Sequence, residues 1–138
     1  MYRLDLNGTQ VTVPGVVKLL RSLPNVCIKF SLGTVGHRIL ELGGSSTDDG
    51  DLEHFRGLKE LQSVDLSRTN IDDAGLMTVQ AWPELYSLDL TETGITDNGL
   101  KHLRSLTQLR DLKLSGTKVT DRGIADLKQA LPLLNVER

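Results

Sequence analysis

Hydrophobic residues recur along this chain in a cycle that alternates between two spacings. Leu85, Leu88 and Leu90 stand at intervals of three and then two positions, and the shorter interval fits a strand with one buried face. After a polar turn, Leu100 and Leu103 begin a stripe at every third position, as on one face of a short helix. Each cycle therefore predicts a strand, a turn, a helix and a return segment.

The cycle repeats with a period of 24 residues. Leu61, Leu85 and Leu109 begin three near-copies, each 24 positions after the last. A repeat of this length is typical of a solenoid, in which one unit cannot bury its apolar face alone and stacks on the next. Two further columns run through the copies: Thr69, Thr93 and Thr117, and Gly75, Gly99 and Gly123.

An aspartate stands just before each predicted helix, at Asp73, Asp97 and Asp121. A carboxylate in this place can accept hydrogen bonds from the free N–H groups of the first helical turn, so we expect the three aspartates to cap their helices. The same role accounts for a row of carboxylates without a metal ion, because each helix terminus neutralises its own aspartate.

The repeated pattern LxxLxLxxTx(I/V)xDxG(L/I)xx(L/V) resembles a leucine-rich repeat of the ribonuclease-inhibitor-like subclass, of the type common in bacterial arrays. The resemblance is strong over residues 61–138 and looser over much of the rest. It implies an α/β solenoid, a right-handed β-α superhelix with a parallel sheet on the concave side and helices on the convex side. Many such repeats carry Asn or Cys after the strand. Here threonine takes that place, and its hydroxyl can still hydrogen-bond the neighbouring loop backbone.

We interpret residues 1–138 as a single domain with an irregular beginning. Regular repeats occupy residues 37–138, where a degraded unit begins at His37 and a shortened unit at Leu133. Residues 1–36 form an irregular N-terminal unit, because their match to the end of the chain has an offset that is out of phase with 24 residues.

The connection between these two parts is too short for a regular coil. Only 12 positions separate Ile28 from Leu40, and about eight of these residues lie between the two expected strands, whereas a parallel crossover needs a dozen residues or more. We therefore expect an antiparallel hairpin through residues 33–36, with an irregular bulged repeat as the alternative.

Composition argues against several classes of function. The chain has 16 basic and 18 acidic side chains, a net charge of −2 and a pI near 5.9, so no overall field attracts nucleic acid or an anionic membrane. No apolar run approaches the ~18 residues that span a bilayer. The N-terminal segment carries charges and lacks the apolar stretch of a secretory signal. These features predict a cytoplasmic protein.

Candidate chemistry is sparse. Cys27 is the only cysteine, and only Lys29 stands near enough in sequence to lower its pKa, so a structural cysteine is favoured over a reactive thiol. The acidic turn 43–51 lacks the ligand spacing of a calcium loop. The histidines form no column: His37, His54 and His102. We therefore expect no catalytic residues, no metal and no cofactor.

Outward-facing strand positions predict columns on the concave face. One column is Glu41, Asp65, Asp89, Lys113 and Glu137, and another is Ile39, Ser63, Ser87, Asp111 and Asn135. Successive acidic side chains about 4.8 Å apart repel one another, and a purely structural face has little reason to align them, although a solvated charged face is an equally weighted alternative. Tyr86 and Arg110 lie beside the columns and belong to residue types that dominate interface energies. The predicted protein-binding residues are Asp65, Tyr86, Asp89, Glu92, Arg110 and Lys113.

The size of this face limits what it can bind. Strands of about five residues would give a face of about 400 Å², half of the ~800 Å² that each partner buries in a standard interface. The leading hypothesis is a non-enzymatic protein–protein interaction module that binds a protein partner through its concave face. The alternatives are a structural unit that forms homo-oligomers through exposed edge strands and, remotely, a thiol-dependent enzyme.

Overall fold

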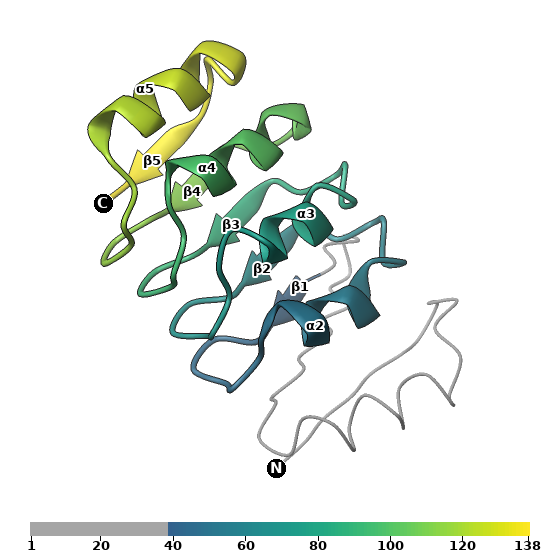
Figure 1. Cartoon of the computed structure of the whole chain (residues 1–138). Coiled ribbons are helices and arrows are strands. Elements are labelled where there is room, and N and C mark those ends of the chain that lie inside the picture. The colour runs from purple at the N-terminus through teal and green to yellow at the C-terminus, as the bar shows by residue number, and fades with distance from the viewer. Residues whose placement is uncertain (1–38) are drawn as a thin grey trace.

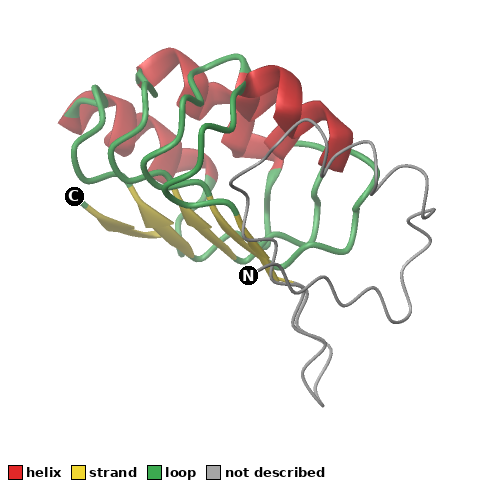
Figure 2. Ribbon diagram, turned by 90° about the horizontal axis from the view of Figure 1, so that it is seen from below, coloured by secondary structure: helices red, strands yellow, loops and turns green. Residues whose placement is uncertain are grey.

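The computed structural model describes residues 39–138, which wind into a stack of coils (Figure 1). Strands form one layer of the stack and helical segments form the opposite layer (Figure 2). This arrangement confirms the α/β solenoid that the repeat predicts. The expected hairpin at residues 33–36, Cys27 and the boundary between residues 36 and 37 lie outside the described residues.

The described strands lie side by side in one parallel sheet, in the order β1-β2-β3-β4-β5. Each pairs with the next at an offset of one repeat, as in the pairs Leu40↔Val64 and Leu88↔Leu112. The repeat period therefore sets the register of the sheet. The bounds are β1 Ile39–Glu41, β2 Ser63–Asp65, β3 Ser87–Asp89, β4 Asp111–Lys113 and β5 Asn135–Glu137.

The middle residues of the strands form a continuous apolar spine. Val64, Leu88 and Leu112 are each 1% exposed, and each lies in register with its neighbour. Full burial of one such side chain stabilises the fold by about 1.5–3 kcal/mol. The short strands therefore contribute chiefly by stacking one buried side chain per coil.

Helical segments on the convex side are short, and two of them tighten into 3-10 geometry. Helices of this length are unstable alone, so packing on the spine holds them in place. Leu76, Leu100 and Leu127 supply that packing and are almost fully buried. The bounds are α2 Asp49–Leu52 continuing as η1 Glu53–Phe55, α3 Gly75–Val79, α4 Asp97–Leu100 continuing as η2 Lys101–Ser105, and α5 Asp121–Ala130.

Trp82, the only tryptophan in the sequence, fills the convex layer between two coils. Its ring is fully buried, and its indole Nε1 donates a hydrogen bond of 3.1 Å to the carbonyl oxygen of Phe55 in the preceding coil. The bond satisfies the one polar atom of this large side chain, as a buried indole requires.

The threonine column closes the turn that follows each strand. The hydroxyls of Thr69 and Thr93 each donate a 2.6 Å hydrogen bond to the carbonyl oxygen three residues earlier, at Leu66 and Leu90. Thr117 repeats the bond at 2.7 Å. The acceptor is therefore a backbone carbonyl oxygen at the end of the strand in the same coil. An Asn side chain at this position would have two N–H donors and could bond a second group as well.

The helix caps stand one position before the predicted aspartates. Asp48, Thr96 and Thr120 are the N-cap residues of α2, α4 and α5, and the side chain of each accepts a backbone N–H from the first turn. The expectation that Asp97 and Asp121 cap these helices is wrong, because both residues are already the first residues of the helices. An N-cap needs the extended backbone that Asp48, Thr96 and Thr120 have.

Helix α3 differs from the other helices, because Ala74 occupies its N-cap position and makes no side-chain bond to the helix. Asp73 precedes this residue, and it too is not the cap. The nearby carboxylate of Asp72 instead accepts the N–H of Ala74 at 2.8 Å.

Asp73 and Asp97, which do not cap their helices, instead join successive coils. Asp97 accepts two hydrogen bonds from Thr120 in the next coil, 2.7 Å from the backbone N–H and 2.6 Å from the hydroxyl. Asp73 accepts the same pair from Thr96 at 2.7 and 2.5 Å. We call each such pair an Asp–Thr clasp. These bonds hold the pKa of Asp97 below its ordinary value, the hydroxyl of Thr120 being the largest cause.

The glycine column exists because the clasp needs its space. A Cβ atom at Gly99 would overlap the carboxylate of Asp73, and one at Gly123 would overlap the carboxylate of Asp97. Two apparently separate sequence columns, aspartate and glycine, are thus the two sides of one contact between neighbouring coils.

Candidate functional site

The concave face presents the predicted columns in register. Residues on either side of each buried strand centre point outward, and the pairs Asp65↔Asp89 and Ser87↔Asp111 lie on adjacent strands. In Figure 2 the strands form a layer that the helices do not cover. Most of the outward side chains are half-buried or exposed.

Two of the aligned acids have a structural role. The backbone N–H of Ser67 donates to the carboxylate of Asp65, and that of Thr91 donates to Asp89, both at 2.9 Å. These are Asx turns, which shape the chain as it leaves the strand. Contrary to the expectation from the sequence, Asp65 and Asp89 therefore have a structural reason to stand at aligned positions.

The repulsion between neighbouring acids ends at β4. Lys113 Nζ lies 3.7 Å from Asp89 Oδ2, which makes an ion pair across two strands. Lys113 is half exposed, so the pair contributes at most about 1 kcal/mol and leaves much of the lysine open to solvent.

A column of left-handed backbone lies just beyond the strands. Gly44 and Gly116 have φ of 73° and 70°, as expected of glycine, but Arg68 and Glu92 occupy the same position with φ of 55° and 56°. A non-glycine residue pays roughly 1–2 kcal/mol for this conformation. Arg68 Nε lies 3.5 Å from Glu92 Oε2, and both side chains are largely exposed. Residues held in such strain often serve a function.

The two predicted anchors come from consecutive coils but differ in freedom. Tyr86 is 53% exposed, whereas Arg110 is half-buried and its Nη1 donates to the carbonyl oxygens of Thr107 and Leu109 at 2.8 and 3.0 Å. The backbone N–H of Arg110 donates to the carbonyl of Tyr86 at 2.8 Å. Tyr86 is therefore the freer of the two to contact a ligand.

Tyr86 borders a hollow of about 480 Å³ on the concave face. The lining is predominantly apolar and comes from three successive coils. Of the predicted binding residues only Tyr86 lines it. Glu84 and Gln108 contribute from the loops before β3 and β4, and they were missed in the sequence because they lie outside the strand positions, although they stand 24 residues apart. The lining residues are Ile39, Gln62, Ser63, Glu84, Tyr86, Ser87 and Gln108.

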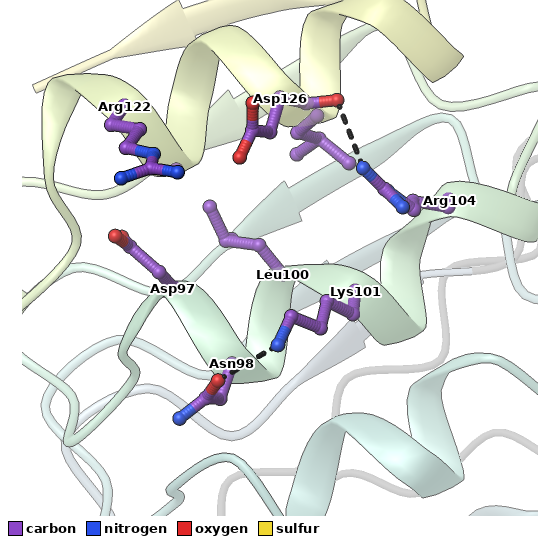
Figure 3. Close-up of a pocket in the computed structure, with 9 residues that line it drawn as sticks. Asp97, Asn98, Leu100, Lys101, Arg104, Arg122 and Asp126 are labelled. Carbon is purple, nitrogen blue, oxygen red and sulfur yellow. Dashed lines mark hydrogen bonds between the residues drawn. The ribbon is translucent and has the colours of Figure 1, made fainter.

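A smaller hollow, of about 280 Å³, lies on the convex side between α4 and α5 (Figure 3). Two of its basic side chains already have partners, because Lys101 Nζ donates to Asn98 at 2.9 Å and an Arg104 Nη donates to the backbone carbonyl of Asp126 at 3.4 Å. Charges of both signs surround it, so it selects no single class of ligand.

Neither a metal cluster nor a membrane helix stands out in the part of the chain that the structure describes. No group of three His, Cys, Asp or Glu residues between 39 and 138 could hold a metal ion. None of the helices in the same range combines the length and the apolar character needed to cross a bilayer.

Comparison with known proteins identifies the family. The sequence model described as Leucine Rich repeat matches residues 59–79, 85–103 and 101–128. This is a leucine-rich repeat protein. The ribonuclease-inhibitor-like subclass stays a prediction. No curated protein matches the sequence significantly.

Solved structures share the fold at low sequence identity. The chain superposes on a leucine-rich repeat protein of Leptospira interrogans with a TM-score of 0.50 and 16% identity, covering 62% of this chain and 21% of that one. The Mex67:Mtr2 subunits of Chaetomium give a TM-score of 0.59 and 19% identity, with 72% and 78% coverage. The chain thus spans about a fifth of the Leptospira protein. Leucine-rich repeat domains generally mediate protein–protein interaction and are generally non-enzymatic.

Proposed function

We propose that this leucine-rich repeat chain is a non-enzymatic module that binds a protein partner through its concave face. The observation that carries the proposal is the half-exposed ring of Tyr86 beside an apolar hollow. The other residues proposed to contact the partner lie on the same strands or in the loops beside them, and Lys113 and Glu92 are exposed. The full proposed set is Asp65, Tyr86, Asp89, Glu92, Arg110 and Lys113.

The proposed binding surface includes loops beside the strands. Three-residue strands give less area than the ~800 Å² per partner of a standard interface. The loops that supply Glu84 and Gln108 on one side and the strained pair Arg68 and Glu92 on the other widen the surface. A partner that touches both loop edges as well as the strands would reach the required size.

Partner capture with a matched pair of variants tests the proposal. The immobilised chain is exposed to proteins of the source cell, and bound proteins are quantified by mass spectrometry. Tyr86→Gln replaces an exposed aromatic residue with the residue found at the equivalent position, Gln62. Met77→Gln removes a side chain of similar exposure, 50%, from α3 on the convex side. We expect Tyr86→Gln to lose partners that Met77→Gln retains; equal retention by both variants would reject the concave face.

A second candidate is self-assembly through β5. This strand is the last in the sheet order, and Leu133, just before it, is 73% exposed. Edge strands that present unpaired backbone groups are templates for pairing with another chain. Sedimentation velocity across a dilution series separates the two candidates, because a constant monomer mass excludes edge pairing. The cytoplasmic location stays a prediction that cell fractionation would test.

A further inference from the structure

The hollow beside Tyr86 combines an apolar lining with an acidic surrounding. Glu84 is the only charged residue among the described residues that line it. The side chain of Glu84 is exposed and makes no hydrogen bond or ion pair with residues 39–138. Asp111, on the strand next to Ser87, has only a 3.4 Å contact from the amide of Asn135. Negative charge near the hollow is therefore incompletely compensated.

The basic side chains of this face already contact groups of this chain. Lys113 pairs with Asp89 at 3.7 Å, and Arg110 donates to two carbonyl oxygens of its own loop. Arg68 pairs with Glu92 at 3.5 Å on the far loop edge. Acidic residues outnumber basic ones on the concave face of the described residues. The acids are Glu41, Glu84, Asp65, Asp89, Asp111 and Glu137, and the bases are Arg110 and Lys113.

We propose that the hollow receives a lysine or arginine side chain from a basic segment of a protein partner. The inference rests on the proposed function and names the chemistry of the partner. The aliphatic stem of the incoming residue packs on the apolar lining, as long basic side chains do on apolar surfaces. Its cationic head lies against the ring of Tyr86 and the carboxylate of Glu84, which supply cation–π and charge attraction together.

Other occupants fit the hollow less well. An acidic segment meets like charge at Glu84 and Asp111, which opposes approach. A purely apolar side chain would cover the carboxylate of Glu84 without giving it a partner, and that desolvation costs free energy. The cationic side chain satisfies both the apolar lining and the carboxylate.

An NMR titration of the full chain tests the inference with defined probes. The probe is a short Gly/Ser peptide that carries arginines at alternate positions, compared with matched peptides that carry glutamate or leucine instead. We expect the arginine peptide alone to shift the amide signals of Ser63, Tyr86 and Ser87 in a dose-dependent manner. Raising the salt concentration should weaken the effect, because the attraction is partly electrostatic and largely solvent-exposed.

Matched variants locate the interaction. Glu84→Gln and Tyr86→Gln introduce the residues that stand at equivalent positions of neighbouring coils, Gln108 and Gln62, so the fold accommodates them. Each should weaken the arginine peptide by about threefold. Tyr86→Phe should retain binding, because a cation–π contact needs the ring and not the hydroxyl. Asp126→Asn, which removes one exposed carboxylate from α5 on the convex side, should have no effect.

Several outcomes would overturn the inference. Absence of shifts at the hollow, equal shifts with the leucine peptide, or an unchanged affinity in Glu84→Gln would each do so. Nuclear Overhauser contacts from the Tyr86 ring to residues 1–38, or peptide-independent shifts on dilution, would show that this chain itself fills the hollow. If captured partners depend on Tyr86 but not on Glu84, the interaction module stands and the basic segment is rejected.

Discussion

Two regions of the solenoid, the Asp–Thr clasps and the concave face, use the 24-residue repeat in opposite ways. At the two complete clasps, successive coils present the same residue types, because each aspartate bonds the next coil and glycine must leave room for it. On the concave face, equivalent positions differ: Gln62, Tyr86 and Arg110 form one column, and Gly44, Arg68, Glu92 and Gly116 form another. Contact between coils therefore enforces uniformity, and solvent permits the variation that a binding surface needs.

The largest expected effect separates the spine from the face within one coil. Leu90 is fully buried, so Leu90→Ala should lower the free energy of unfolding by about 2–5 kcal/mol. Tyr86→Ala, at an exposed position, should change it by no more than about 0.5 kcal/mol. Urea denaturation of both variants measures the difference. A neutral Leu90→Ala would contradict the assigned spine.

Next in size is a test of the space that the clasp requires. In helix α5, alanine is intrinsically favoured over glycine by about 1 kcal/mol. Gly123→Ala should nevertheless destabilise by about 1–3 kcal/mol, because the new Cβ overlaps the carboxylate of Asp97. Gly57→Ala, where a Cβ meets nothing within 4 Å, is the matched control and should be close to neutral. If thermal or urea melts show that Gly123→Ala is more stable than the parent, the Asp97 carboxylate does not require glycine at this position.

The negative charge of Asp97 in the clasp should make the free energy of unfolding depend on pH. The pKa of Asp97 is lowered in the folded protein, so its ionisation contributes stability above the unfolded-state pKa, about 3.9, and this stability is lost as the pH falls through the lower folded-state value. Asp97→Asn should therefore cost about 1 kcal/mol at neutral pH and less near the acid limit. Urea melts at several pH values test this; a constant difference would show that the charge plays no part.

The first described junction lacks a complete clasp. Asp49 meets Asp72 where later coils have threonine, so Asp49 accepts a backbone N–H at 3.0 Å but no hydroxyl. Burial chiefly, and the adjacent carboxylate of Asp72 in addition, raise the pKa of Asp49. Asp72→Thr should supply the hydroxyl and stabilise the protein by about 1 kcal/mol at neutral pH.

The pH dependence of this substitution has a defined sign. With a raised folded-state pKa, the parent protein gains at the Asp49–Asp72 contact as the pH falls, so the advantage of Asp72→Thr should shrink under acidic conditions. Carboxyl NMR titration should also show a lower pKa for Asp49 in the variant. An unchanged pKa would show that Asp72 does not influence it.

The smallest expected effect on stability concerns the strained column of the face. Arg68→Gly and Glu92→Gly relieve the left-handed backbone but add freedom to the unfolded chain, so each should stabilise by no more than about 1 kcal/mol. If the strain serves binding, the same variants should capture less partner. Variants that are less stable than the parent would show that the Arg68–Glu92 ion pair outweighs the strain.

The sequence predicts the fold well, because each 24-residue repeat forms one coil and successive coils stack in register. The interval of 24 residues gives the sheet, its register and the spine through Val64, Leu88 and Leu112, all without side-chain geometry. The helix caps were misplaced by one residue, because neighbouring positions such as Thr96 and Asp97 can both cap, and only the backbone conformation distinguishes them.

The candidate site was harder to predict than the fold. Outward columns follow from strand alternation, but the hollow depends on loop residues such as Glu84 and Gln108, which stand one period apart but lie outside the strands, where alternation does not tell which way a side chain points. Gly44 and Gly116 stand three repeats apart and are a sequence signal of the left-handed column. Arg68 and Glu92 occupy the two equivalent positions between them and hide that signal. The freedom of Tyr86 and the tethering of Arg110 follow only from atomic contacts.

The buried indole of Trp82 gives this protein an internal optical reporter. Its nitrogen is bonded to a carbonyl 27 residues earlier, so the bond breaks when the coils that contain Phe55 and Trp82 separate. Fluorescence emission should shift to longer wavelength at that moment, because the ring passes from an apolar environment to water. If the emission changes at a lower urea concentration than the circular dichroism signal, one end of the stack opens before the rest, as linear arrays of repeats allow.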